Sequence, residues 1–335
     1  MAEINDDNLL DSQKVFTYLS TVSPVPFSTA FSFNKKIKSY IESKGIPIPE
    51  YNIFVNDDQV YKLYSDHLYD SSSKVIDKIY DVQFRDIVVK EEVVAVLWFG
   101  ISKFVKGLPL SSNPNAGLRF KQWNIEVGND TNSVSFFPDK RGTYYFIGEI
   151  HTLPGVLKAN SRRDGFIFSE SSEKVKIQLK NLCKDELTAF FRKANVIKTN
   201  LNKGDNYKKV IDTFNNTSKK GWKNEKEKAQ AKAKIELEYE ITKGSLDTVE
   251  NFKEADDLVT KTLLEVYDDR INEFNIDSIE STKNEIVEDK QIKVKFEKQG
   301  INKEYFLKIV EEVLTEKVPF SKATIIIDDI KDRLA

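Results

Sequence analysis

The sequence predicts an α+β fold in which a strand-rich region precedes a mainly helical one. Residues 117–120 and 124–127 alternate apolar and polar side chains, which is the period of half-buried strands. Residues 144–150 are rich in aromatic and β-branched side chains, which strand surfaces favour. After Ser169 the apolar residues recur at helical spacing instead. Strands followed by a run of helices are typical of α+β proteins and not of doubly wound folds.

Two short helices are predicted in an N-terminal lead-in that spans residues 1–48. The apolar spacing in residues 8–19 predicts the first helix. The Ser23-Pro24-Val25-Pro26-Phe27 segment ends it, because a proline pushes the residue before it out of the helical region. Residues 34–43 carry the second helix, and Gly45 is expected to terminate it.

A sheet domain is predicted over residues 49–198. In two further pairs of predicted strands, polar turn residues lie between the two strands, and this arrangement is typical of β-hairpins. The pairs are residues 51–55 with 59–63, around Asn56-Asp57-Asp58, and residues 82–89 with 93–99, around Lys90-Glu91-Glu92. The strand at 93–99 is almost entirely apolar, so we expect it in the interior of its sheet.

A helical arm is predicted over residues 199–276, and a small helical module over residues 277–335. Residues 202–243 are rich in intermixed Lys, Glu and Asn, a pattern typical of an exposed helix or of one half of a coiled coil. Gly244 and Ser245 are expected to break this helix, and Ser245 can cap the next one. The two helices would then form a long antiparallel hairpin with its tip at these two residues.

The composition gives no reason to expect a nucleic-acid or membrane partner. The chain has 51 Lys and Arg residues against 53 Asp and Glu residues, for a formal net charge of -2. No apolar run has transmembrane length, and the acidic first residues differ from a secretory signal, so we expect a cytoplasmic protein. The single cysteine, Cys183, lies in an apolar helical pattern and is expected to be a core residue.

Motifs for independent catalysis are absent from the sequence. Neither of the glycine-rich phosphate-binding patterns, GxxxxGKS/T and GxGxxG, occurs. The two histidines, His67 and His151, lie far apart without further ligands at metal-binding spacing, so we expect no metal site. His151 is expected to have a structural or interface role. We expect no cofactor in this chain, and the sequence leaves open whether it is part of an enzyme.

The most distinctive polar segment is a turn with two adjacent guanidinium groups. It reads Asn160-Ser161-Arg162-Arg163-Asp164. A planar guanidinium forms charge-assisted, bidentate hydrogen bonds with phosphate oxygens. The alternative is that both arginines are ordinary surface residues, paired with Asp164 or Glu170.

Three segments resemble the transducer, or middle, domain of the GHKL ATPases. That superfamily includes the heat-shock-type chaperones, gyrase, MutL and the MORC proteins. The segments are residues 118–128, Phe146-Ile147-Gly148-Glu149-Ile150-His151, and the turn at residues 160–164. The sequence is most similar to bacterial chaperone-like ATP-binding proteins, in which a GEIH strand precedes an Asn-x-Arg-Arg-Asp turn. The resemblance covers about residues 11–182.

This resemblance implies a ribosomal S5-like transducer domain that directly follows an ATPase domain. In the family, a basic residue on this turn contacts the γ-phosphate in the neighbouring ATP site. By its place in the motif that role falls on Arg163, with Arg162 as the alternative. Asn160 would help to shape the turn, and Asp164 would orient one of the arginines. ATP and Mg²⁺ would be bound by the ATPase domain, in cis or in trans.

The motifs of the GHKL nucleotide site do not occur in residues 1–335. The N-box helix with Glu and Asn, the DxGxG segment and the glycine-rich lid are all absent. The resemblance therefore implies the transducer and C-terminal parts of a chaperone-like ATPase, and the isolated chain is expected neither to bind nor to hydrolyse ATP. Two alternatives stay open. One is a non-catalytic interaction or dimerisation module that uses the helical arm, and the weaker one is DNA binding by its Lys-rich helix.

Overall fold

A computed structural model describes residues 12–274 and 276–287, with short helical pieces at 307–308, 310–311, 313–314, 323 and 326–331. The chain divides into two compact units, Met1–Val287 and Glu288–Ala335. The elements described below all belong to the first unit. The module predicted at residues 277–335 lies largely outside the described residues, as does the start of the helix predicted at residues 8–19.

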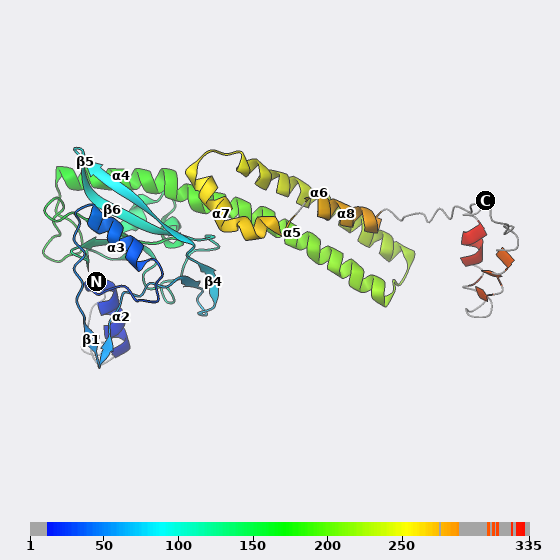
Figure 1. Ribbon diagram of the computed structural model, residues 1–335, viewed down its shortest axis with the longest axis horizontal. Helices are drawn as coiled ribbons and strands as arrows, with labels where there is room; N and C mark the ends of the chain where they lie inside the picture. Colours follow the sequence, from blue (N-terminus) through cyan, green and yellow to red (C-terminus); the bar gives the residue numbers. More distant parts are fainter. Residues whose placement is uncertain are drawn as a thin grey trace. The chain divides into compact units, whose positions relative to one another are not determined.

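The first unit is α+β, as predicted, and its framework is a mixed five-stranded sheet (Figure 1). The strand order is β5-β6-β9-β7-β8. The strands are β5 Asp81–Val89, β6 Glu92–Ile101, β7 Gly117–Gln122, β8 Ile125–Glu126 and β9 Ile147–Thr152. β7 runs parallel to β9, and the other neighbours are antiparallel. The apolar strand predicted at residues 93–99 is β6, an inner strand, as expected.

Tight turns with left-handed backbone connect the hairpin strands. Positive φ angles occur at Asn56 and Asp57, at Lys90 and Glu91, and at Trp123 and Asn124. Two consecutive positive φ angles are what a type I′ hairpin turn requires. The first of these turns joins β1 Phe54–Val55 to β2 Asp58–Gln59, and a separate pair is formed by β3 His67–Tyr69 and β4 Val75–Lys78. The predicted hairpins are present, with shorter strands at β1 and β2.

β9 is the central strand, and it begins later than the sequence predicts. Residues Lys140–Tyr145 form a 3-10 helix, η2, so the strand starts at Ile147 and not at Tyr144. All six residues of β9 are buried. A Cβ on Gly148 would lie 2.3 Å from the carbonyl oxygen of Trp98, so β6 and β9 can pair here only because this residue is glycine.

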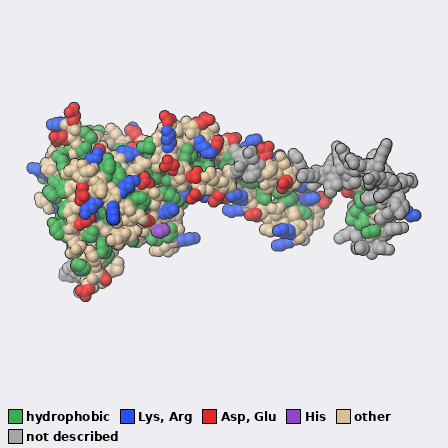
Figure 2. Space-filling model, in the orientation of Figure 1, with side chains coloured by type: hydrophobic (Ala, Val, Ile, Leu, Met, Phe, Trp, Pro, Cys, Tyr) green, Lys and Arg blue, Asp and Glu red, His purple; other side chains and the backbone are tan. Residues whose placement is uncertain are grey.

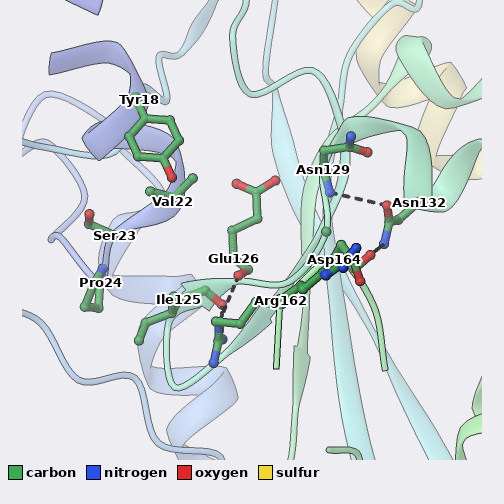
Figure 3. Close-up of a pocket in the computed structure, with 12 residues that line it drawn as sticks. Tyr18, Val22, Ser23, Pro24, Ile125, Glu126, Asn129, Asn132, Arg162 and Asp164 are labelled. Carbon is green, nitrogen blue, oxygen red and sulfur yellow. Dashed lines mark hydrogen bonds between the residues drawn. The ribbon is translucent and has the colours of Figure 1, made fainter. Parts of the chain in front are cut away.

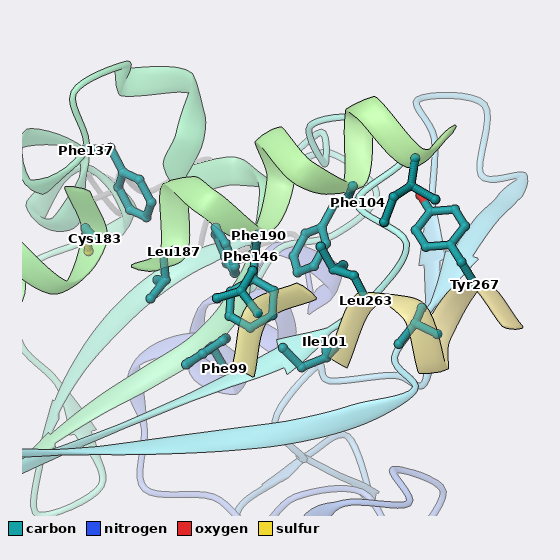
Figure 4. Close-up of a cluster of buried hydrophobic side chains, with 14 of the residues drawn as sticks. Phe99, Ile101, Phe104, Phe137, Phe146, Cys183, Leu187, Phe190, Leu263 and Tyr267 are labelled. Carbon is teal, nitrogen blue, oxygen red and sulfur yellow. The ribbon is translucent and has the colours of Figure 1, made fainter. Parts of the chain in front are cut away.

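Helices cover both faces of the sheet, and alternate residues of β6 point to the two faces. Val96 and Trp98 pack with Ile37 and Ile41 of α3 Asn34–Ser43. Leu97 and Phe99 belong to the other cluster, which α4 Glu170–Leu182 and α5 Thr188–Lys220 cover (Figure 4). A π-helical turn, Cys183–Leu187, joins these two helices. Cys183 is buried, as predicted, and burial raises the pKa of its thiol to about 12.

α5 and α6 Glu225–Lys253 pack along each other in opposite directions (Figure 1). The Thr242 hydroxyl donates to the carbonyl oxygen of Lys203 at 3.2 Å, and the Tyr207 and Tyr239 rings are 6.5 Å apart. Four residues, 221–224, connect the two helices. Gly221, with φ 91°, ends α5, and the Asn224 side chain caps α6. The turn between the helices is therefore at residues 221–224.

The prediction that Gly244 and Ser245 break the helix is wrong, because both lie inside α6. The Ser245 hydroxyl donates to the carbonyl oxygen of Ile241, four residues earlier. A glycine in a helix interior costs only about 1 kcal/mol, and burial of the neighbouring Leu246 and Val249 outweighs it. The chain leaves α6 after Lys253, and α7 Leu258–Asn272 and α8 Ile276–Val287 follow.

The boundary predicted between residues 198 and 199 lies inside α5, so one helix continues from the sheet region into the arm.

Of the helices that the structure describes, none combines the length and the apolar character needed to cross a bilayer.

The position of Gly244 inside α6 predicts that Gly244→Ala stabilises the protein. Gly244 is exposed, its φ is not positive, and no described atom lies within 4 Å of the position of the added Cβ. Alanine should raise the free energy of unfolding by about 1 kcal/mol in urea denaturation. Gly221→Ala is the matched control, and it should destabilise because Gly221 has a left-handed φ of 91°. A loss of stability in Gly244→Ala would contradict a continuous helix at this point.

Candidate functional site

A pocket of about 380 Å³ lies beside the arginine turn (Figure 3). One wall comes from α2 Ser12–Val22 and the residues after it, and the other comes from β8 and the turn. The lining residues are Tyr18, Val22, Ser23, Pro24, Ile125, Glu126, Gly128, Asn129, Asn132, Arg162, Arg163 and Asp164. The pocket thus brings together three of the four residues that the sequence singles out, while Asn160, which is part of the turn, does not line the pocket.

Asn160 holds the turn closed through its side chain and its backbone. Its side-chain amide donates to an Asp164 carboxylate oxygen at 2.5 Å, and its Oδ1 accepts from the Asp164 backbone N–H at 3.2 Å. Its carbonyl oxygen accepts from the Arg163 N–H at 2.9 Å. Arg163 has a left-handed φ of 56°, a conformation that this bonding pattern helps to hold.

Asp164 contributes to the turn and not to an arginine. Its carboxylate bonds to Asn160, and its carbonyl oxygen accepts from the Asn132 amide at 3.2 Å. Among the described residues it makes no ion pair with Arg162 or Arg163, so the orienting role suggested for Asp164 is not observed. Glu170, the other acid considered for these arginines, pairs with Lys174 at 2.6 Å.

The Arg163 guanidinium is partly buried, and among the described residues its hydrogen bonds are to backbone carbonyl groups. Its Nε lies 3.4 Å from the carbonyl oxygen of Glu126, and its Nη2 lies 3.4 Å from that of Gln122 and 3.5 Å from that of Ile125. These hydrogen bonds are at the long end of the accepted range, so each is weak. Burial lowers the pKa of Arg163, and no described carboxylate offsets this by pairing with it. Within the described part of the chain, Arg163 is therefore a partly desolvated cation without a paired carboxylate.

Arg162 is exposed and lines the same pocket (Figure 3). In the part of the chain that the structure describes, its side chain has neither a hydrogen bond nor an ion pair. Two neighbouring guanidinium groups without acidic partners therefore border one pocket. This arrangement favours an anionic ligand, and phosphate and carboxylate are the anions whose geometry matches the guanidinium fork.

Glu126 is a pocket residue that the sequence analysis missed. Its Oε1 accepts from Arg119 at 3.0 Å, and its Oε2 lies 3.6 Å from the Lys121 ammonium. Oε2 is buried and has no hydrogen-bond partner among the described residues. In the sequence Glu126 is an ordinary polar position of an alternating strand, so no local signal distinguishes it.

A buried ionic cluster lies next to Glu126 and is centred on Glu149 of β9. The Lys62 ammonium is 2.9 Å from both carboxylate oxygens of Glu149, and the two side chains are 1% and 0% exposed. His151 Nε2 donates to Glu149 at 2.9 Å, and Trp98 Nε1 donates to it at 3.2 Å. His151 is thus buried and hydrogen-bonded within the sheet, as a structural histidine is.

The pKa shifts in this cluster follow from burial and from the surrounding charges. Burial lowers the pKa of Lys62 to about 8, although Glu149 opposes the shift. Burial also lowers the pKa of His151, so its ring is neutral at pH 7. Burial alone would raise the pKa of Glu149, but Lys62, His151 and Lys121 together hold it well below its usual value. Glu149 is therefore ionised.

Lys121 connects the cluster to the helix that forms the other wall of the pocket. Its ammonium donates to the carbonyl oxygen of Thr21 in α2 at 2.5 Å, and it lies 4.0 Å from Glu149. The position of α2, and with it one side of the pocket, therefore depends on a buried residue of β7. The described residues contain no group of three or more His, Cys, Asp or Glu side chains that could hold a metal ion.

The chain was compared with known proteins at three levels. It matches no protein-family model, no curated protein and no solved structure. Its function has to be inferred from the residues and geometry of the pocket.

Proposed function

We propose that this chain is the transducer and C-terminal part of a chaperone-like GHKL ATPase. In this proposal a separate ATPase domain binds ATP and Mg²⁺, the sheet domain is S5-like, and the turn at residues 160–164 presents an arginine to the γ-phosphate. The observation that carries the proposal is the pair of guanidinium groups, Arg162 and Arg163, that line one pocket without an acidic partner among the described residues. Such groups are available to stabilise the charge that develops during phosphoryl transfer.

Arg163 is the stronger candidate for the phosphate contact. Its guanidinium already lacks part of its hydration, and it bonds only to neutral oxygens at 3.4–3.5 Å. Exchange of these weak bonds for bidentate bonds to a phosphate would supply both the counter-charge and better geometry. Arg162 is exposed, so water already solvates its charge and a phosphate contact would gain less.

The proposal is tested by supplying the ATPase domain, from the same parent protein or from a partner encoded beside it. Without that domain the chain is expected to show no ATP hydrolysis, because its sequence has no phosphate-binding loop and no N-box carboxylate to position the attacking water. The mixture should hydrolyse ATP faster than the ATPase domain alone, by up to about 10³-fold if the arginine acts as arginines do in other phosphoryl-transfer enzymes. Steady-state hydrolysis measures both. Hydrolysis by the isolated chain that a substitution in this chain abolishes would contradict the proposal.

A second candidate function, a non-catalytic interaction or dimerisation module, rests on the exposed surface of α6. Leu237 and Ile241 lie one helical turn apart and are 61% and 40% exposed. Analytical ultracentrifugation of the full chain would favour this candidate if it found a dimer that Leu237→Lys dissociates and if no ATPase domain were stimulated. DNA binding has less support, since acidic and basic side chains are intermingled over the described residues on the face shown in Figure 2.

A further inference from the structure

The pocket has a second polar end, formed by the carboxylate of Glu126. Its side chain is 3% exposed, yet the residue lines the pocket. One oxygen, Oε1, is bound by Arg119, whereas Oε2 has no hydrogen-bond partner among the described residues. Figure 3 shows the carboxylate in the space between Tyr18 and Asn129. A buried, unsatisfied acceptor that borders a pocket is a place where a bound molecule can donate a hydrogen bond.

The surroundings of Glu126 determine which kind of donor fits. Arg119 lies 3.0 Å from Oε1 and Lys121 lies 3.6 Å from Oε2, so two cations already balance the negative charge. A third cation, such as a ligand ammonium, would be repelled by both. A neutral donor would satisfy Oε2 without that repulsion. The geometry therefore favours a hydroxyl or amide group at this end of the pocket.

The two polar groups of the pocket, the Arg163 guanidinium and the Glu126 carboxylate, come from the same wall. The Arg163 side chain contacts the backbone carbonyl oxygen of Glu126 itself, at 3.4 Å, so the guanidinium and the carboxylate project from neighbouring positions. A volume of about 380 Å³ is within the range of small-molecule sites. Arg162, Arg163 and Glu126 all line this pocket.

We propose that this pocket binds a hydroxylated phosphate ester. Its phosphate would bond to Arg162 and Arg163, and a hydroxyl group would donate to Glu126 Oε2. The inference goes beyond the proposed function, because it concerns a small molecule bound by this chain alone and requires no ATPase domain.

The test is a calorimetric titration of the full chain with four probes that share a phosphate and differ in the group that it carries. The probes are inorganic phosphate, ethyl phosphate, glycerol 3-phosphate and aminoethyl phosphate. Glycerol 3-phosphate should bind about tenfold more tightly than ethyl phosphate, since only its hydroxyl groups can donate to Glu126. Aminoethyl phosphate should bind more weakly than glycerol 3-phosphate, because its ammonium approaches Arg119 and Lys121.

Variants separate the two ends of the pocket. Glu126→Gln should remove the preference for glycerol 3-phosphate over ethyl phosphate, and Arg162→Ala should weaken all four probes alike. Arg141→Ala is the control, since Arg141 is 88% exposed, pairs with Asp139 and lies outside the pocket. Because the ranking of the four probes is measured on the unaltered chain, it stands even if Glu126→Gln fails to fold. Equal affinity for ethyl and glycerol phosphate, tightest binding of the amine, or no binding of any probe would overturn the proposal.

Discussion

Replacing Arg163 by alanine is expected to lower the ATP turnover of a reconstituted ATPase that contains this chain by about 10³-fold. The expectation rests on the proposed function. A γ-phosphate contact from a second domain forms mainly in the closed state, so its free energy stabilises the transition state more than the bound nucleotide. Nucleotide affinity should therefore change little. Steady-state hydrolysis beside a nucleotide-binding titration separates the two effects.

Three companion variants distinguish the charge of Arg163 from its part in the local structure. Arg163→Lys should rescue turnover only in part, because lysine keeps the charge but not the bidentate fork. Arg163→Gln keeps a donor for the carbonyl groups of Gln122 and Ile125 without the charge, and it should be nearly as inactive as alanine. Arg162→Ala should have a much smaller effect. Equal, small losses in the two alanine variants would mean that the turn is ordinary charged surface.

The parts of the fold that could be predicted from the sequence are those that neighbouring residues determine. The β5–β6 hairpin follows from an apolar run on each side of Lys90 and Glu91, whose left-handed backbone makes the turn. The place of β9 could not be predicted in this way. It pairs with β6 on one side and parallel to β7 on the other, and these pairings join residues 30 to 57 positions apart. The break expected at Gly244 failed for a related reason, because tertiary packing outweighs the low helix propensity of one glycine.

The candidate site also combines a part that could be predicted from the sequence with a part that could not. The turn from Asn160 to Asp164 could be recognised from five adjacent residues, since its charges and its closing hydrogen bonds are local. The rest of the lining could not, because Tyr18 and Glu126 are far from the turn in sequence and the sequence assigns neither of them a role in a site. The buried pair of Lys62 and Glu149 also could not be predicted, since 87 positions separate the two residues.

The second large effect is expected from Glu149→Gln, which should lower the free energy of unfolding by about 3–5 kcal/mol at pH 7. The substitution removes the carboxylate that Lys62, His151 and Trp98 share, and it leaves the Lys62 ammonium buried without its nearest counter-charge. Urea denaturation followed by circular dichroism measures the loss. Glu170→Gln is the matched control, because Glu170 is an exposed partner of Lys174 and should contribute less than about 1 kcal/mol.

The pH dependence of this loss shows whether the buried charge causes it. The pKa of Lys62 is lowered to about 8 in the folded protein and is about 10.5 when unfolded. Glu149 opposes the lowering of this pKa, so the pKa of Lys62 falls further in Glu149→Gln, and the parent keeps a folded-state proton that the variant loses more readily; this advantage of the parent disappears as the pH rises past 8. The difference in stability between the parent protein and Glu149→Gln should consequently shrink between pH 7 and pH 10. The double variant Lys62→Met with Glu149→Gln should recover part of the loss at pH 7, because the unpaired ammonium is gone. A loss that equals that of Glu170→Gln, or that stays constant across this pH range, would show that the pair contributes little to folding and that the cluster is held by packing alone.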